Sequence, residues 1–289
     1  MTNENNVTSA SPDGEVTLDI LPVDNDSTND DMPRPRVAVI TIRRDYKRNA
    51  LNADVCGQIA SYVHEAENME PVRAILLRGE GKAFCAGADL AGGVYTSSFH
   101  HNLDAMLMSI THSPLPVIAD VHGPAVGAGA QLAMACDLRV VGESGWFSIP
   151  VVRLGIAVDP WTIRRAVELL GGARARSFLY TAERLGPDVA VATGLASLRG
   201  NDEDAWQVAV DQATTAPLTF RYLKAVFNQT VPTGVAQGGS AKGTRDASAD
   251  LPAVYERLRS ELSLIHISER TRRSLRSYAG GGVHHGGGG

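Results

Sequence analysis

Two short segments rich in glycine and alanine have the composition of a backbone that contacts a ligand. The first loop, residues 82–90, reads KAFCAGADL, and the second loop, residues 122–131, reads HGPAVGAGAQ. Small side chains let a ligand approach the backbone closely, and the start of a helix presents N–H groups without partners. One N–H group from each loop could stabilise a carbonyl oxygen on which charge develops, as in an oxyanion hole. Tight packing of a helix against a sheet is the alternative explanation.

The residues around the two loops predict alternating strands and helices. Asn52 is suited to cap a helix over 53–67. Runs rich in β-branched residues predict strands at 37–42, 72–78, 116–121, 138–141 and 146–148. Further helices are predicted at 98–112, 127–136, 161–170, 173–181, 187–192, 203–213 and 217–228. This order indicates an α/β fold in which right-handed crossovers bury each helix against the sheet.

Composition separates a core from its flanking segments. Residues 1–33 carry eight acidic side chains and no Lys or Arg, which is typical of a disordered tail, with partner binding as the alternative. Within it, the apolar patch 16–23 could pair weakly with another segment. The last residues lack a helix or strand period and resemble a translated sequencing adapter. The predicted boundaries are 1–35 for a disordered acidic tail, 36–230 for the core, 231–250 for a flexible linker, 251–261 for a C-terminal helix and 262–289 for non-native sequence.

Overall composition excludes several classes of protein. The net charge of −5 over 289 residues argues against a general nucleic-acid-binding surface. Cys56, Cys85 and Cys136 lie far apart without a CxxC pair, which argues against a disulfide scaffold or a zinc site and favours a reducing, cytoplasmic setting. No run of about 18 apolar residues is present, so we expect a soluble protein without membrane insertion.

Taken together and in order, four motifs resemble the crotonase (enoyl-CoA hydratase/isomerase) superfamily. They are KRNALN at 47–52, AFCAGADL at 83–90, PVIADVHGPAVGAGAQLAMACDLR at 116–139 and FSIPVVRLG at 147–155. The resemblance covers roughly 36–230. It implies a crotonase-like spiral of ββα units with C-terminal helices, assembled as a trimer or a dimer of trimers. It also implies an acyl-CoA thioester as ligand or substrate in fatty-acid or long-chain lipid metabolism, without a separate cofactor or metal.

The resemblance assigns roles to particular residues. Ala88 and Ala128 would donate the two oxyanion N–H groups to the thioester oxygen. The positions expected to contact CoA are Lys47, Arg48, Lys82 and Ala86. For the three basic residues, a solvated basic surface is the alternative.

Two departures from the family concern proton transfer. Hydratases of this family carry two glutamates that hold and activate water, and this chain has Gln131 and Val151 in their places. Glutamine exchanges no proton at neutral pH and valine cannot hydrogen-bond water. Losing one positioned acid or base typically costs about 10²–10⁴ in rate. We therefore expect little hydratase activity and a drier pocket that favours a long acyl chain, as in the actinobacterial acyl-CoA-binding branch that this sequence resembles.

One carboxylate keeps a second hypothesis open. Asp159 lies where dienoyl-CoA isomerases and aroyl-CoA dehalogenases of the superfamily place a catalytic aspartate, but an Asp before Pro160 is also a natural helix N-cap. We expect a structural role for His122 and a packed, unreactive thiol at Cys85. The sequence thus leaves two hypotheses: an acyl-CoA-binding protein without hydratase activity, or an active enzyme of the family that uses Asp159.

Overall fold

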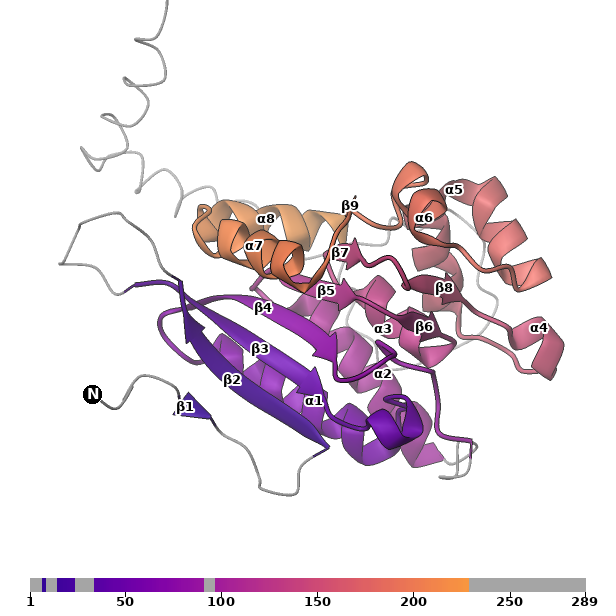
Figure 1. Cartoon of the computed structure of the whole chain (residues 1–289), viewed down its shortest axis with the longest axis horizontal. Coiled ribbons are helices and arrows are strands. Elements are labelled where there is room, and N and C mark those ends of the chain that lie inside the picture. Colours follow the sequence, from indigo (N-terminus) through magenta and orange to yellow (C-terminus); the bar gives the residue numbers. More distant parts are fainter. Residues whose placement is uncertain (1–6, 9–14, 24–33, 91–96, 229–289) are drawn as a thin grey trace, which may run out of the picture. The chain divides into compact units, whose positions relative to one another are not determined.

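The computed structural model describes residues 7–8, 15–23, 34–90 and 97–228 of the chain (Figure 1). The chain divides into two compact units, Met1–Pro217 and Leu218–Gly289. Helix α8 (Pro217–Phe227) belongs almost entirely to the second unit. All other elements lie in the first unit, which contains both glycine-rich loops.

The first unit is built on a seven-stranded sheet of order β1-β2-β3-β4-β5-β7-β9. β2 runs antiparallel to its neighbours β1 and β3, and the strands from β3 to β9 are parallel. A second, two-stranded parallel sheet joins β6 to β8. The strands are β1 (Val7–Thr8), β2 (Val16–Pro22), β3 (Arg36–Ile42), β4 (Val72–Gly79), β5 (Val117–Val121), β6 (Pro124–Val126), β7 (Leu138–Val141), β8 (Trp146–Ser148) and β9 (Leu198–Arg199).

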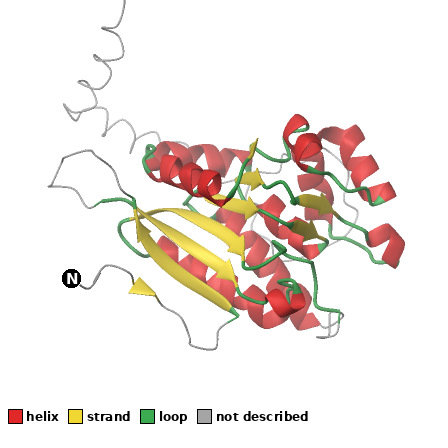
Figure 2. Ribbon diagram, in the orientation of Figure 1, coloured by secondary structure: helices red, strands yellow, loops and turns green. Residues whose placement is uncertain are grey.

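Helices cover both faces of the main sheet, as Figure 2 shows. The helices of the first unit are η1 (Asp45–Lys47), α1 (Ala53–Glu67), α2 (Ser97–His112), α3 (Ala128–Ala135), α4 (Val151–Leu154), α5 (Pro160–Thr181), α6 (Pro187–Ala192) and α7 (Asp202–Ala213). Alternate residues of β3 enter different cores: Ile40 joins α1, α2 and α3 in the larger core, and Val39 packs in a smaller core with α7. Burial on both faces explains why these strands read as continuous apolar runs.

The predicted α/β class is confirmed, and so are most element positions. α1 covers the predicted residues, and the Asn52 side chain accepts a hydrogen bond from the N–H of Val55 (2.8 Å), as an N-cap does. The two helices expected at 161–170 and 173–181 are the two halves of α5, which is interrupted at Gly171, where φ is +73°. Five short elements, each of four residues or fewer, were not predicted: β1, η1, β6, α4 and β9.

The predicted disordered tail needs a correction. Residues 16–22 form β2, which pairs along its whole length with β3 and buries Val16, Leu18 and Ile20 in the larger core. The apolar alternation of this stretch outweighs the acidic composition around it. Val7–Thr8 of the predicted tail also form a strand, β1, which pairs with β2. Residues 1–6, 9–14 and 24–33 of that tail, the linker at 231–250, the helix at 251–261 and the non-native segment at 262–289 lie outside the described residues.

Candidate functional site

The two glycine-rich loops lie against each other. The Cys85 N–H donates to the Pro124 oxygen and the Val126 N–H donates to the Cys85 oxygen, both at 3.0 Å, so the first loop pairs with β6 in the second loop. Gly87 has φ +101°, and a Cβ there would lie 2.7 Å from the Val126 oxygen and 3.7 Å from the Ala128 nitrogen. Only glycine fits this close approach.

The amides predicted to form the oxyanion hole are brought together by this contact. The Leu51 N–H donates to the Gly87 oxygen (2.7 Å), and the Leu51 oxygen accepts from the Asp89 N–H (2.8 Å). Leu51 therefore pairs with the residues on either side of Ala88 and leaves the Ala88 N–H without a bond to Leu51. Ala128 is the first residue of α3, where an N–H has no partner within the helix. Neither amide donates a hydrogen bond to any residue that the structure describes. Their arrangement suits a shared carbonyl oxygen, and the oxyanion role stays a prediction.

Gln131 and Asp159 belong to one hydrogen-bonded network. The buried Gln131 side chain projects from α3, and its Nε2 donates to Asp159 Oδ2 (2.9 Å) and to Thr162 Oγ1 (2.6 Å). Thr162 in turn donates its backbone N–H to Asp159 Oδ1 (2.9 Å) and its hydroxyl to Asp159 Oδ2 (2.6 Å). The carboxylate therefore has three donors, and its predicted role as the N-cap of α5 is confirmed.

Two further residues bear on proton transfer. Val151, at the other lost glutamate position, opens α4 and is half-buried against the larger core. Asp104 on α2 was missed by the sequence analysis. Partial burial raises the pKa of Asp104, and the negative charge of Asp159 raises it further. Asp104 lies in an amphipathic helix without a motif, so no sequence signal could have identified it.

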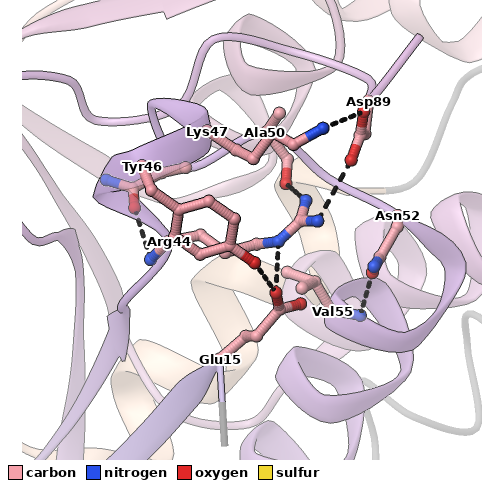
Figure 3. Close-up of polar contacts among 9 residues, drawn as sticks. Glu15, Arg44, Tyr46, Lys47, Ala50, Asn52, Val55 and Asp89 are labelled. Atoms are coloured by element: carbon pink, nitrogen blue, oxygen red, sulfur yellow. Dashed lines mark hydrogen bonds and ion pairs between the residues drawn. The ribbon is translucent and has the colours of Figure 1, made fainter. Parts of the chain in front are cut away.

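A buried arginine fixes the segment before the first loop, as Figure 3 shows. The Arg44 guanidinium donates to Glu15 Oε1 (2.6 Å), the Ala50 oxygen (2.6 Å) and Asp89 Oδ2 (3.0 Å). Lys47 Nζ lies 3.5 Å from the other Asp89 oxygen. Since Asp89 follows Ala88 directly, this network holds the backbone of a predicted oxyanion donor in place.

The structure brings the predicted CoA contacts into one region. The Ala86 N–H donates to the Arg48 oxygen (3.0 Å), and the Lys82 N–H donates to Asp45 Oδ1 (3.3 Å) in η1. Lys47, Arg48 and Lys82 all have exposed side chains. They form a basic surface beside the first loop, and CoA contact stays a prediction.

The two residues expected to be structural agree with the structure. His122 Nε2 lies 3.0 Å from the Gly81 oxygen, so the ring links the second loop to the turn that follows β4. Cys85 is fully buried, and burial raises the pKa of its thiol to about 12. A thiol in this state is not a nucleophile at neutral pH. In the described part of the chain, no group of three or more His, Cys, Asp or Glu side chains could hold a metal ion.

Comparisons with known proteins agree with this geometry. Residues 34–241 match the family model described as enoyl-CoA hydratase/isomerase. The chain is 41% identical over 192 residues to "Probable enoyl-CoA hydratase echA6" of Mycobacterium bovis, covering 66% of this chain and 79% of that protein. It is 31% identical over 204 residues to the short-chain-enoyl-CoA hydratase of Clostridium acetobutylicum, covering 67% and 78%.

A solved structure shares the fold. The enoyl-CoA hydratase of Bacillus anthracis superposes with a TM-score of 0.70 at 23% identity, covering 92% of this chain and 96% of that chain. None of the described helices has the length and apolar character needed to cross a membrane.

Proposed function

Because the chain belongs to the enoyl-CoA hydratase/isomerase family, with the crotonase fold, we propose that it binds acyl-CoA thioesters and has little or no hydratase activity. The observation that carries the proposal is the pair of amides at Ala88 and Ala128, next to a network in which Gln131 is bound to Asp159. The amides offer two donors to a thioester oxygen. The network offers no free base to a water molecule.

Binding is supported by the preformed shape of the two loops. Gly87 and the start of α3 are fixed by backbone hydrogen bonds, so little rearrangement is needed when a carbonyl oxygen enters. Such donors typically contribute a factor of about 10²–10³ when charge develops on the oxygen. Without a proton acceptor, the same donors hold a thioester in place but do not complete its hydration.

The lack of hydration follows from the side chains around the thioester position. Gln131 cannot accept a proton, and its Nε2 is already bound to Asp159 and Thr162. Val151 presents only carbon atoms. The carboxylate within the network, Asp159, caps α5 and accepts three hydrogen bonds, which a general base would have to give up in part.

A second function is favoured by one observation. Asp159 Oδ2 lies only 2.9 Å from the side chain at the family's acid/base position, so a small shift would turn it toward a substrate. An isomerase that uses Asp159 is the alternative. Turnover of enoyl-CoA and dienoyl-CoA by the wild type and by Asp159→Asn separates the two functions. Equal rates remove Asp159 from the chemistry, whereas a loss of at least about 100-fold in the variant, with binding retained, establishes the enzyme.

Apolar side chains support a long acyl chain as ligand. Val151 and Trp161 are half-buried against the larger core. Burying an aliphatic group of the ligand contributes about 1.5–3 kcal/mol. We place this binding in cytoplasmic fatty-acid or long-chain lipid metabolism. Exposed apolar residues on α4 and α5 support a homotrimer or a dimer of trimers; they are Val152, Leu154, Ile163 and Val167.

Calorimetry with CoA, butyryl-CoA, octanoyl-CoA and palmitoyl-CoA tests the proposal. We expect affinity to rise with chain length and crotonyl-CoA hydration to stay near the uncatalysed rate. Gly87→Ala places a methyl group 2.7 Å from the Val126 oxygen and should abolish thioester binding. Gly57→Ala, whose Cβ meets only Asn102 Nδ2 at 3.7 Å, is the matched control and should bind normally. Palmitoyl-CoA binding no better than free CoA contradicts the proposal.

A further inference from the structure

One polar pocket has a lining that includes neither Ala88 nor Ala128. It has a volume of about 600 Å³ and is lined by the carboxyl ends of β3, β4 and β5 and by the residues that lead into α7. This volume is in the range of sites that hold a small molecule. Nothing in the proposed thioester chemistry uses it.

The register of β3, β4 and β5 places three pocket-lining side chains next to one another. Thr41, Arg78 and Asp120 are direct neighbours across β3, β4 and β5, so their side chains share one face of the sheet. Two residues earlier on the same face, the row of Val39, Leu76 and Ile118 packs in the smaller core with α7. α7 begins at Asp202, which lines the pocket. The helix thus covers the apolar row, and the polar row lies at its N-terminal end.

Asp120 is the residue that points to a ligand. It is 4% exposed and lines the pocket, yet it accepts no hydrogen bond from any described residue. Burial raises the pKa of Asp120; the charges of His122 and Arg78 oppose this rise, and Asp202 adds to it. A buried carboxylate without a partner is costly unless a cation or a donor reaches it. Its sequence neighbours Ala119 and Val121 face the larger core, on the opposite side of the sheet.

The charged side chains that line the pocket favour a cationic ligand over an anionic one. Five carboxylates and two guanidinium groups line the pocket: Asp19, Glu80, Asp120, Glu143 and Asp202 with Arg43 and Arg78. Arg43 is paired with Glu80 (2.7 Å), and Arg78 donates to Thr41 Oγ1 (3.3 Å). An anionic ligand would meet excess negative charge. Among the described residues, no group of three or more His, Cys, Asp or Glu side chains could hold a metal ion.

We propose that this pocket binds a small organic ammonium ion, whose N–H groups donate to the Asp120 carboxylate. The ammonium supplies the hydrogen bonds that Asp120 accepts from no described residue. Asp202, at the N-terminal end of α7, adds a second negative charge that acts on the same region as Asp120.

Calorimetry on the full chain tests this site with putrescine as the probe and 1,4-butanediol as its neutral analogue. We expect saturable binding of the diamine and none of the diol. Asp120→Asn should weaken diamine binding at least about 10-fold, because the amide oxygen can still accept a hydrogen bond but the negative charge that pairs with the ammonium is gone. Glu203→Gln removes an exposed charge outside the pocket lining, on the same turn of α7, and should change binding less than about 2-fold.

Asp202→Asn is the second variant if Asp120→Asn does not fold, and it should also weaken diamine binding. Denaturant unfolding checks the fold of each variant. The proposal is overturned if the diamine does not bind, if the diol binds equally well, or if a folded pocket variant binds the diamine as tightly as Glu203→Gln.

Discussion

Gln131→Glu tests whether the amide at the family's acid/base position is structurally required. In the wild type, Nε2 of this buried side chain donates to Asp159 Oδ2 at 2.9 Å and to Thr162. The substitution restores the residue type that hydratases carry but removes both donated bonds. It also places a second carboxyl group against Asp159. The variant should therefore become less stable as the pH rises.

The magnitude follows from the distance. Two unit charges 2.9 Å apart repel by about 6 kcal/mol at an effective dielectric constant of about 20. Because one proton shared by the pair removes this repulsion, the pKa of one carboxyl should rise by about 3 units or more. The pKa of this carboxyl is about 4.3 in the unfolded chain and higher in the folded protein. Its contribution to stability is complete below the unfolded-state pKa and is lost as the pH rises through the folded-state pKa. Between pH 5 and pH 8, the expected loss is about 3–4 kcal/mol.

Urea unfolding of wild type and variant at pH 5 and pH 8 measures this loss. Gln207→Glu is the matched control, because Gln207 Nε2 donates to Asp211 Oδ1 at 2.8 Å on the exposed surface of α7. There, the same change of amide to carboxyl should cost less than about 1 kcal/mol at either pH. If Gln131→Glu shows no greater pH dependence than Gln207→Glu, the Gln131–Asp159 contact does not hold the network and the reasoning fails.

Three further predictions concern packing and burial. Arg44→Met removes the buried partner of Asp89 and should lower the free energy of unfolding by about 3–5 kcal/mol, whereas Arg43→Met at an exposed ion pair should cost less than about 1 kcal/mol in the same urea titration. Gly57→Ala lies within α1 with space for a methyl group, so it should raise the midpoint of thermal unfolding through a gain of about 0.5–1 kcal/mol, and a lower midpoint would show that the helix is overpacked there. Cys85 should react with iodoacetamide at pH 8 only after unfolding, because its thiol is buried and its pKa is raised to about 12. Peptide mapping by mass spectrometry measures the labelling, and rapid labelling of the native protein would contradict the prediction.

Much of the fold could be predicted because local signals and tertiary packing agree in this chain. Asn52 and Asp159 both cap the helices that follow them, and in each case a short side chain accepts from a backbone N–H three residues later. The two loops were identified because small residues are needed where two backbones meet, as at Gly87. β2 was misread because its acidic neighbours dominate the local composition, although its apolar alternation matches a half-buried strand.

The charged residues that were missed show why side-chain chemistry needs the structure. Asp104 lies on a helix whose pattern gives no reason to turn it toward Asp159. Asp120 lies in the apolar run of β5, and the alternation of that strand places it on the same face as Ile118. Whether this face is covered at Asp120 depends on where α7 begins, some 80 residues later in the chain. A helix that started one turn earlier would pack over Asp120, so a buried carboxylate is tolerated at this position only because α7 begins at Asp202 and leaves the end of the strand to the pocket.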